Sequence, residues 1–172
     1  WAGLPLPEIN LRTYVTRDGV PSVYFFSLDA QGVTSVLGAR LFQHLPYYYA
    51  RISLDWDGER VAFDSRRLHP GDRPAVYEAT YGPTGEPFAS SEDPLAEFLV
   101  ERYRFYTEAP DGSVRYTKVS HEPWTLYPAA VEIERASICE SNGFARPDAD
   151  PVYYYSPGLD VAASTSERAG GE

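Results

Sequence analysis

The chain has 172 residues with 43% hydrophobic and 15% aromatic content, which is typical of one globular domain with a sizeable core. Its formal net charge of -10 excludes nucleic acid as an expected partner, because phosphate binding needs a basic stripe and the sequence shows none. No apolar run is long enough to span a bilayer and no signal peptide opens the chain, so we expect a cytoplasmic protein without membrane contact.

A strand with one polar face is predicted first. Residues 8–16 alternate so that four polar side chains share a face, namely Glu8, Asn10, Arg12 and Tyr14. After a hairpin turn at 18–19, an apolar strand follows, with Val23 and Phe25 on one face and Tyr24, Phe26 and Leu28 on the other. Because buried charges are costly unless paired, a polar row beside an apolar row predicts a partly enclosed, polar-lined concavity.

A helix is predicted next, capped by Asp29 and running to about His44, with Arg40 on its apolar stripe. Pro46 ends this helix and begins an extended segment, 47–54. Two further strands are expected on the carboxyl side of a turn, at 60–67 and 76–81.

A second, short helix is predicted where Asp93 supplies the cap and Pro94 takes the first position, with Leu95, Phe98 and Leu99 facing inward. The strands expected beyond it are 103–107, 114–120, 124–138 (at least over 130–135) and 152–155. Residues 1–163 therefore form a single domain, and the small, polar tail, 164–172, is expected to be disordered. These elements predict an α+β fold, mainly antiparallel β, with two short helices and a curled sheet or cone-like β-barrel.

Six blocks of the sequence closely resemble the YqjF-like proteins of bacteria and archaea, a family of unknown function: PEINLRTYV, YFFSLDA, GARLFQHLPYYYA, FLVERYRFY, HEPW and YYSPGLDV. The resemblance covers most of residues 5–161. That family is in turn similar to the acetoacetate decarboxylase superfamily, which implies a cone-shaped antiparallel β-barrel around a small-molecule pocket. The same resemblance implies that Glu8 matches the pocket glutamate of the decarboxylases. It also implies an N-terminal portion that is missing here, as does the absence of methionine from a chain that begins at Trp1.

The sequence departs from the decarboxylases at the position of their reactive amine. In those enzymes two lysines follow the helix proline, and one of them forms a Schiff base with the β-keto acid. Here Pro46 is followed by Tyr47 and Tyr48, and a phenol cannot condense with a ketone. The resemblance therefore implies the fold and the pocket but not that mechanism.

Three charged residues are candidates for the pocket. Glu8 and Arg12 either line a ligand cavity as a charged pair, or form a structural ion pair or an exposed strand face. Arg40 either binds a substrate carboxylate through its planar fork of donors, or serves as a partner of Glu8 or as a charge at the helix end.

The tyrosines after Pro46 alternate along a strand, so either Tyr48, or Tyr47 with Tyr49, faces the cavity. Each offers a ring for stacking and a phenol that donates or accepts a hydrogen bond, although core packing is an equally simple role.

The segment after the second helix supplies the other candidates. Glu101, beside Tyr103, either acts as an acid or base if burial raises its pKa, or forms a surface ion pair. His121 either shuttles a proton or is a structural histidine at a strand end, and Trp124 lies in the same short motif.

Other chemistry is not indicated. A single cysteine, Cys139, allows no internal disulfide, and His44 and His69 lack the spacing of a metal site. Nucleotide-binding, nucleophile-elbow and zinc-protease motifs are all missing from the sequence, so we expect no metal and no cofactor.

We therefore expect a pocket for a small organic acid or carbonyl compound, with possible lyase-like chemistry that does not use a Schiff base. The alternative is a non-catalytic ligand-binding or structural protein. Catalytic roles are assigned to Glu8, Glu101 and Tyr48. Ligand-binding roles are assigned to Arg12, Arg40, Tyr47, Tyr103, His121 and Trp124.

Overall fold

The computed structural model describes residues 7–32, 44–68 and 73–170. In these residues twelve strands form one sheet: β1 (Glu8–Arg17), β2 (Val20–Ala30), β3 (Tyr47–Trp56), β4 (Val61–Arg67), β5 (Val76–Pro83), β6 (Phe88–Ala89), β7 (Arg104–Glu108), β8 (Val114–Ser120), β9 (Thr125–Ala136), β10 (Tyr154–Tyr155), β11 (Ala162–Ala163) and β12 (Glu167–Arg168). The helices are α2 (Pro94–Val100), α3 (Ile138–Ser141) and a 3₁₀ turn, η1 (Ser90–Glu92).

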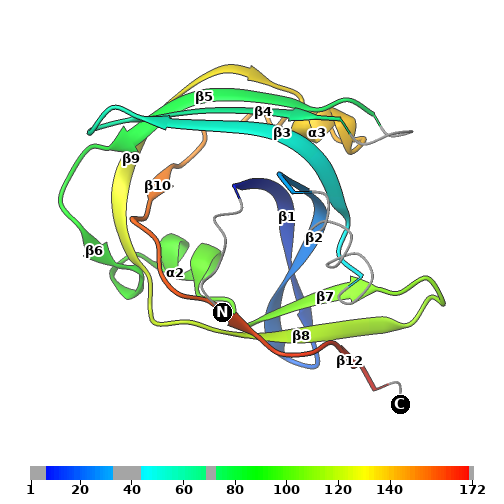
Figure 1. Ribbon diagram of the computed structural model, residues 1–172. Coiled ribbons are helices and arrows are strands. Elements are labelled where there is room, and N and C mark those ends of the chain that lie inside the picture. Colours follow the sequence, from blue (N-terminus) through cyan, green and yellow to red (C-terminus); the bar gives the residue numbers. More distant parts are fainter. Residues whose placement is uncertain (1–6, 33–43, 69–72, 171–172) are drawn as a thin grey trace.

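The sheet is curled but not closed, with the order β10-β9-β5-β4-β3-β2-β7-β8-β11; β1 pairs with β2, β12 with β8, and β6 with β9. Figure 1 shows the strands wrapped around a central region in which β1 and α2 lie. Most neighbouring strands are antiparallel, but β2 runs parallel to both β3 and β7. The predicted curled, mainly antiparallel α+β fold is confirmed.

The β1–β2 hairpin forms as predicted. Its two-residue turn places Asp18 and Gly19 at φ 53° and 73°, which matches the twist of the paired strands. The register shifts within the hairpin, because Leu11 pairs with Ser27 and Arg12 pairs with Phe25, so Phe26 is the extra residue of a β-bulge.

The bulge corrects the predicted faces of β2. Simple alternation separates Leu28 from Val23 and Phe25, but an extra residue between them returns all three to one side. Val23 and Leu28 are buried together with Leu45 and Phe105 in the main apolar cluster.

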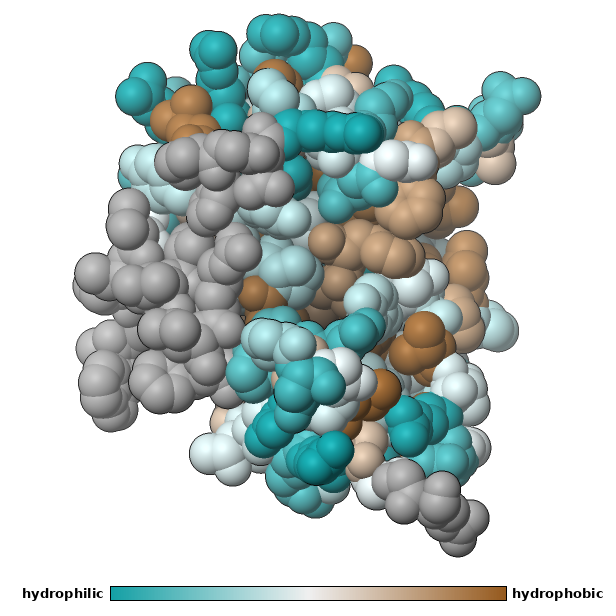
Figure 2. All heavy atoms as spheres, turned by 90° about the vertical axis from the view of Figure 1, so that its right-hand side faces the viewer, coloured by the Kyte–Doolittle hydropathy of each residue, from teal (hydrophilic) through white to brown (hydrophobic). Residues whose placement is uncertain are grey.

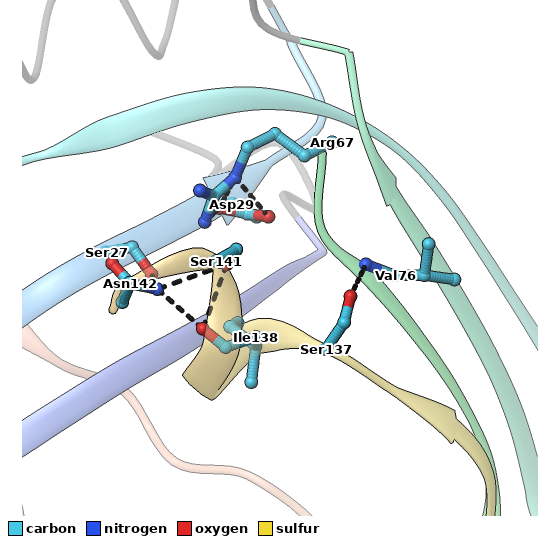
Figure 3. Close-up of polar contacts among 8 residues, drawn as sticks. All are labelled: Ser27, Asp29, Arg67, Val76, Ser137, Ile138, Ser141 and Asn142. Carbon is cyan, nitrogen blue, oxygen red and sulfur yellow. Dashed lines mark hydrogen bonds and ion pairs between the residues drawn. The ribbon is translucent and has the colours of Figure 1, made fainter. Parts of the chain in front are cut away.

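Most of the helix predicted after Asp29, residues 33–43 with Arg40 among them, lies outside the described residues. Asp29, the expected cap, is the next-to-last residue of β2. The Asp29 carboxylate accepts hydrogen bonds from Nε and Nη2 of Arg67, and the shortest joins Nη2 to Oδ1 at 2.6 Å (Figure 3). Both side chains are buried.

Helix α2 has the predicted cap but not the predicted inner face. Asp93 accepts the backbone N–H groups of Leu95 and Ala96. Leu95 and Phe98 are 45% and 48% exposed, whereas Ala96 is fully buried. A helix of only seven residues buries a narrow stripe, and here Ala96 occupies it.

The two ends of the predicted strand series also differ. Strand β9 ends at Ala136, and α3 takes the place of its expected last residues. The expected disordered tail pairs instead with β8: Glu167 lies opposite Tyr116, and Ser164 exchanges backbone and side-chain hydrogen bonds with Lys118. Figure 1 shows this segment running beside β8. An open sheet edge offers unpaired N–H and C=O groups. A polar segment can bind them through its backbone, so a polar composition does not prevent the pairing.

The outer surface is not uniformly polar. Figure 2 shows hydrophilic residues at the top and bottom of one face and apolar residues gathered between them. None of the helices within the described ranges has both the length and the apolar character needed to traverse a bilayer.

Candidate functional site

A pocket of about 340 Å³ lies between β1, β2, β7 and β8 and the end of α2. Its lining combines an apolar wall with charged and aromatic groups: Glu8, Asn10, Arg12, Val23, Phe25, Leu28, Leu45, Tyr47, Val100, Arg102, Arg104, Phe105, Val119, His121, Trp124, Val161 and Ala163. Three of the four residues in the predicted polar row of β1 line this pocket, namely Glu8, Asn10 and Arg12, whereas Tyr14 is not among its lining residues.

Glu8 and Tyr47 form a hydrogen-bonded pair in this pocket. The Tyr47 hydroxyl donates to Glu8 Oε2 at 3.0 Å. Desolvation by the surrounding protein atoms raises the pKa of Glu8, although its side chain remains in contact with solvent. Hydrogen bonds from Tyr47 and Asn10 lower this pKa but offset only part of the rise. Burial, followed by the neighbouring Glu8, raises the pKa of Tyr47, which therefore stays a donor at neutral pH. A carboxyl with a raised pKa beside a phenol can exchange a proton with a ligand.

Three arginines line the same pocket. Arg12 Nη2 donates to the Leu99 carbonyl at 3.1 Å, at the end of α2. Arg102 Nη1 donates to the backbone carbonyl of Glu101 at 2.8 Å, and its guanidinium lies 4.5 Å from the centre of the Phe98 ring.

Arg104 lies over the Tyr116 ring at 4.5 Å, with a long contact of 3.4 Å to the Tyr106 hydroxyl. Among the described residues no carboxylate lies within ion-pair distance of Arg12, Arg102 or Arg104. The Nε atom of Arg102 is buried without a hydrogen-bond partner in the described part of the chain. Such a set of donors suits a carboxylate ligand.

Glu101 supports the pocket wall but does not line it. Its carboxylate accepts the hydroxyls of Ser90 and Tyr103, both at 2.5 Å, and the backbone N–H of Trp124 at 2.9 Å. Burial alone would raise its pKa, but these hydrogen bonds together outweigh burial and lower it. The predicted acid role of Glu101 needs a raised pKa, whereas these hydrogen bonds lower its pKa and hold the carboxylate against Ser90, Tyr103 and Trp124.

Three aromatic side chains pack together beside Glu101, which hydrogen-bonds to Tyr103 and to the backbone of Trp124. The Tyr103 ring lies on His121 with centroids 4.6 Å apart, and Trp124 meets His121 edge-on at 5.7 Å. His121 Nδ1 lies 2.8 Å from the Glu122 carbonyl, which only accepts, so Nδ1 carries a hydrogen. His121 and Trp124 face the pocket, whereas Tyr103 is 45% exposed outside its lining, and the hydrogen bond to Glu101 raises the Tyr103 pKa to about 12.

Tyr48 does not line the pocket. Strand alternation turns Tyr48 away from Tyr47, and the Tyr48 ring lies 4.1 Å below the guanidinium of Arg67. Arg40 lies outside the described residues. The pocket therefore unites Glu8, Arg12, Tyr47, His121 and Trp124.

Sequence reasoning missed Arg102 and Arg104 as pocket residues. Their signal was present: they stand two positions apart where a helix becomes a strand, a spacing that places side chains on one face of an extended chain.

The chain's single lysine is Lys118. Its ammonium lies 3.6 Å from Glu167 on the partly exposed surface of β8 and outside the lining of the pocket. No described pocket residue therefore offers an amine for a Schiff base. In the described ranges no three His, Cys, Asp or Glu side chains gather as a metal site would need.

A larger hollow of about 580 Å³ lies elsewhere, beside Trp56, Arg60 and Tyr155. It is more open, none of the predicted residues line it, and Arg60 there already pairs with Glu132 at 3.1 Å. The smaller pocket is therefore the better candidate.

Comparison with known proteins agrees with the resemblance seen in the sequence. Residues 2–160 match the model of the DUF2071 family, described as an uncharacterized conserved protein. The chain is 41% identical over 155 residues to the uncharacterized protein YqjF of Bacillus subtilis (strain 168), covering 90% of this chain. It spans 63% of the length of that relative.

Solved structures share the fold at low identity. An acetoacetate decarboxylase from Legionella pneumophila aligns with a TM-score of 0.58 and 11% identity over 96% of this chain and 67% of its own. A second acetoacetate decarboxylase aligns with a TM-score of 0.61 and 13% identity, over 94% and 67%. The enduracididine biosynthesis enzyme MppR, complexed with pyruvate, aligns with a TM-score of 0.52 and 12% identity, over 94% and 62%. At these identities the likeness extends to the fold alone.

Proposed function

The chain belongs to the DUF2071 family of uncharacterized conserved proteins, and from this premise we propose that its pocket binds a small organic acid or carbonyl compound. One observation carries the proposal: three arginines, none in an ion pair with a carboxylate among the described residues, line a pocket that has an apolar wall and also contains Glu8 and Tyr47. The buried Nε of Arg102 has no hydrogen-bond partner in the described part of the chain, and a ligand carboxylate would supply one. That MppR was solved with pyruvate supports a carbonyl acid on this fold.

The pocket residues also suit lyase-like chemistry without a Schiff base. Arg12 or its neighbours would hold the ligand carboxylate. Glu8 would move a proton at the carbon next to the ligand carbonyl, and Tyr47 would donate to the oxyanion that develops there. We place this activity in the cytoplasm.

A non-catalytic role is favoured by a different observation. Arg12 and the Tyr14 hydroxyl both donate to the Leu99 carbonyl, at 3.1 and 3.0 Å, and so tie β1 to the end of α2. In this alternative, Arg12 and Tyr14 only stabilise the contact between β1 and α2, and the pocket binds no ligand.

Thermal shift separates the two roles. A panel of small keto and hydroxy acids is screened against the wild type, Glu8→Gln and Arg12→Gln, with Arg51→Gln as the matched control, because Arg51 is exposed on β3 outside the pocket. We expect at least one acid to raise Tm for the wild type and for Arg51→Gln, and the effect to be lost in Arg12→Gln. No response to any acid would support the bracing role and contradict a ligand pocket.

A further inference from the structure

Two N–H groups of the pocket lack a hydrogen-bond partner. Nε of Arg102 and Nε1 of Trp124 are buried, and neither meets an acceptor in the described part of the chain. Both side chains line the pocket of about 340 Å³. Because a buried donor without an acceptor is costly and rare in folded proteins, we expect a ligand in the pocket to supply the acceptors.

Glu101 holds the two residues together. Trp124 donates its backbone N–H to Glu101 Oε1 at 2.9 Å, and Arg102 follows Glu101 directly in the chain. Arg102 Nη1 also donates to the Glu101 carbonyl at 2.8 Å. The two unpartnered N–H groups therefore belong to the same end of the pocket.

The positive charge at this end comes from two arginines. The guanidinium carbons of Arg12 and Arg102 both lie 5.7 Å from the centre of the Tyr14 ring, beside the end of α2. Arg104 lies instead against the Tyr116 ring of β8. A single carboxylate at Arg12 and Arg102 would accept the free Nε–H of Arg102.

His121 supplies a hydrogen-bond acceptor beside Trp124. Its Nδ1 lies 2.8 Å from the Glu122 carbonyl and carries the hydrogen, which leaves Nε2 of the neutral ring as an acceptor. The described residues provide no hydrogen bond to this Nε2. The His121 and Trp124 rings meet edge-on with their centroids 5.7 Å apart, and both line the pocket. A donor and an acceptor therefore stand next to each other in its wall.

A hydroxyl group matches this pair. A hydroxyl both accepts and donates, so it can accept from Trp124 Nε1–H and donate to His121 Nε2. A carbonyl oxygen only accepts, so it can use Trp124 but not the neutral His121. A methylene group can use neither and would leave the buried N–H of Trp124 without a partner.

We infer, resting on the proposed function, that the ligand of this pocket is a short 2-hydroxy acid. Its carboxylate binds at Arg12 and Arg102, and its hydroxyl accepts from Trp124 and donates to His121. The two ligand groups stand on neighbouring carbons because Glu101 holds Arg102 and Trp124 at the same end of the pocket.

The test compares acids that differ only at carbon 2, by calorimetry at pH 8, which favours a neutral imidazole. The probes are each enantiomer of 2-hydroxybutyrate, 2-oxobutyrate and butyrate. We expect at least one enantiomer to bind the wild type about tenfold or more tightly than butyrate, because a site built around a hydroxyl discriminates against an acid that lacks it. 2-Oxobutyrate should fall between the two.

Variants assign this preference to the proposed atoms. Trp124→Phe keeps an aromatic ring but removes the N–H, so the affinity ratio of 2-hydroxybutyrate to butyrate should fall close to one. Trp56→Phe is the matched control with an unchanged ratio, because Trp56 is 64% exposed on β3 and outside this pocket. His121→Phe should remove the preference for 2-hydroxybutyrate over 2-oxobutyrate. Circular dichroism checks that each variant is folded, and the wild-type series tests the inference without any variant.

Equal binding of 2-hydroxybutyrate and butyrate would overturn the inference, indicate that water satisfies the two donors, and leave the organic-acid pocket standing. 2-Oxobutyrate binding as tightly as 2-hydroxybutyrate would overturn it in favour of a carbonyl acid. An unchanged ratio in folded Trp124→Phe would also overturn it. If no acid of this series or of the wider panel binds the folded wild type, the proposed function fails and the inference fails with it.

Discussion

Arg67 and the pocket arginines differ in what balances their charge. Nε and Nη2 of the Arg67 guanidinium both donate to the Asp29 carboxylate (Figure 3). Both side chains are almost completely buried, and the Tyr48 ring lies 4.1 Å from the guanidinium. Arg12, Arg102 and Arg104 contact aromatic rings and carbonyls, without a described carboxylate in reach. The comparison teaches that the buried arginine has a counter-ion within the chain, whereas the pocket arginines have none within ion-pair distance among the described residues; the proposed ligand would supply it.

Breaking the structural pair should have the largest effect. Arg67→Gln leaves the Asp29 carboxylate buried without its cation, so the free energy of unfolding should fall by about 3–5 kcal/mol. Urea denaturation measures the change, with exposed Arg66→Gln on the same strand as the matched control. A loss no larger than that of the control would mean that the pair is not structural.

Glu101→Gln should have an intermediate effect. The variant weakens three hydrogen bonds to an ionised acceptor, and we expect a loss of about 2 kcal/mol at pH 7. Because the folded pKa of Glu101 lies below its ordinary value of 4.5, its contribution is present above pH 4.5 and is lost as pH falls through the folded pKa. Denaturation curves of wild type and variant should therefore converge on acidification. A difference that is constant down to pH 3 would contradict this assignment.

Arg12→Gln should cost much less than Arg67→Gln. Arg12 is exposed and lacks a described ionic partner, so the unfolding free energy should change by less than about 1 kcal/mol. The same urea series measures it. A loss comparable to that of Arg67→Gln would make Arg12 a structural brace and remove the contrast between the two regions.

Glu8→Gln should have the smallest effect, opposite in sign to that of Glu101→Gln. The folded pKa of Glu8 is raised, so its carboxyl favours folding below pH 4.5, and this advantage is lost as pH rises through the folded pKa. At pH 7 the variant should equal or slightly exceed the wild type in stability. Thermal unfolding at pH 4 and pH 7 tests this, and a variant that is less stable at pH 7 but not at pH 4 would contradict the raised pKa.

Local signals predicted much of this fold. The Asp18-Gly19 turn, the Asp93–Pro94 helix start and the polar row of β1 each depend on residues a few positions apart, and all three are found. The features that were missed depend on distant partners. Asp29 meets Arg67 across 38 positions of sequence, which no local pattern encodes, and a bulge at Phe26 reverses the alternation from which faces were assigned.

The site was predicted in part for the same reason. Strand periodicity places Glu8 and Arg12 on one face, and both line the pocket; it left open whether Tyr48, or Tyr47 with Tyr49, faces the cavity, and the structure places Tyr47 there. The lowered pKa of Glu101 could not be predicted, because the fold brings its three donors from η1 and from the residues just before β7 and β9. Arg102 and Arg104 were missed because only the tertiary structure shows which face of that segment is concave.

The most direct test of the central claim follows the arginine Nε–H signals in a ¹H–¹⁵N spectrum while 2-hydroxybutyrate is added, with assignment by single Arg→Lys variants. The account predicts that signals of Arg12 and Arg102 shift in a saturable way while that of Arg67, already bound to Asp29, stays in place. Saturation with no change at these two pocket arginines, or a shift confined to Arg67, would contradict it.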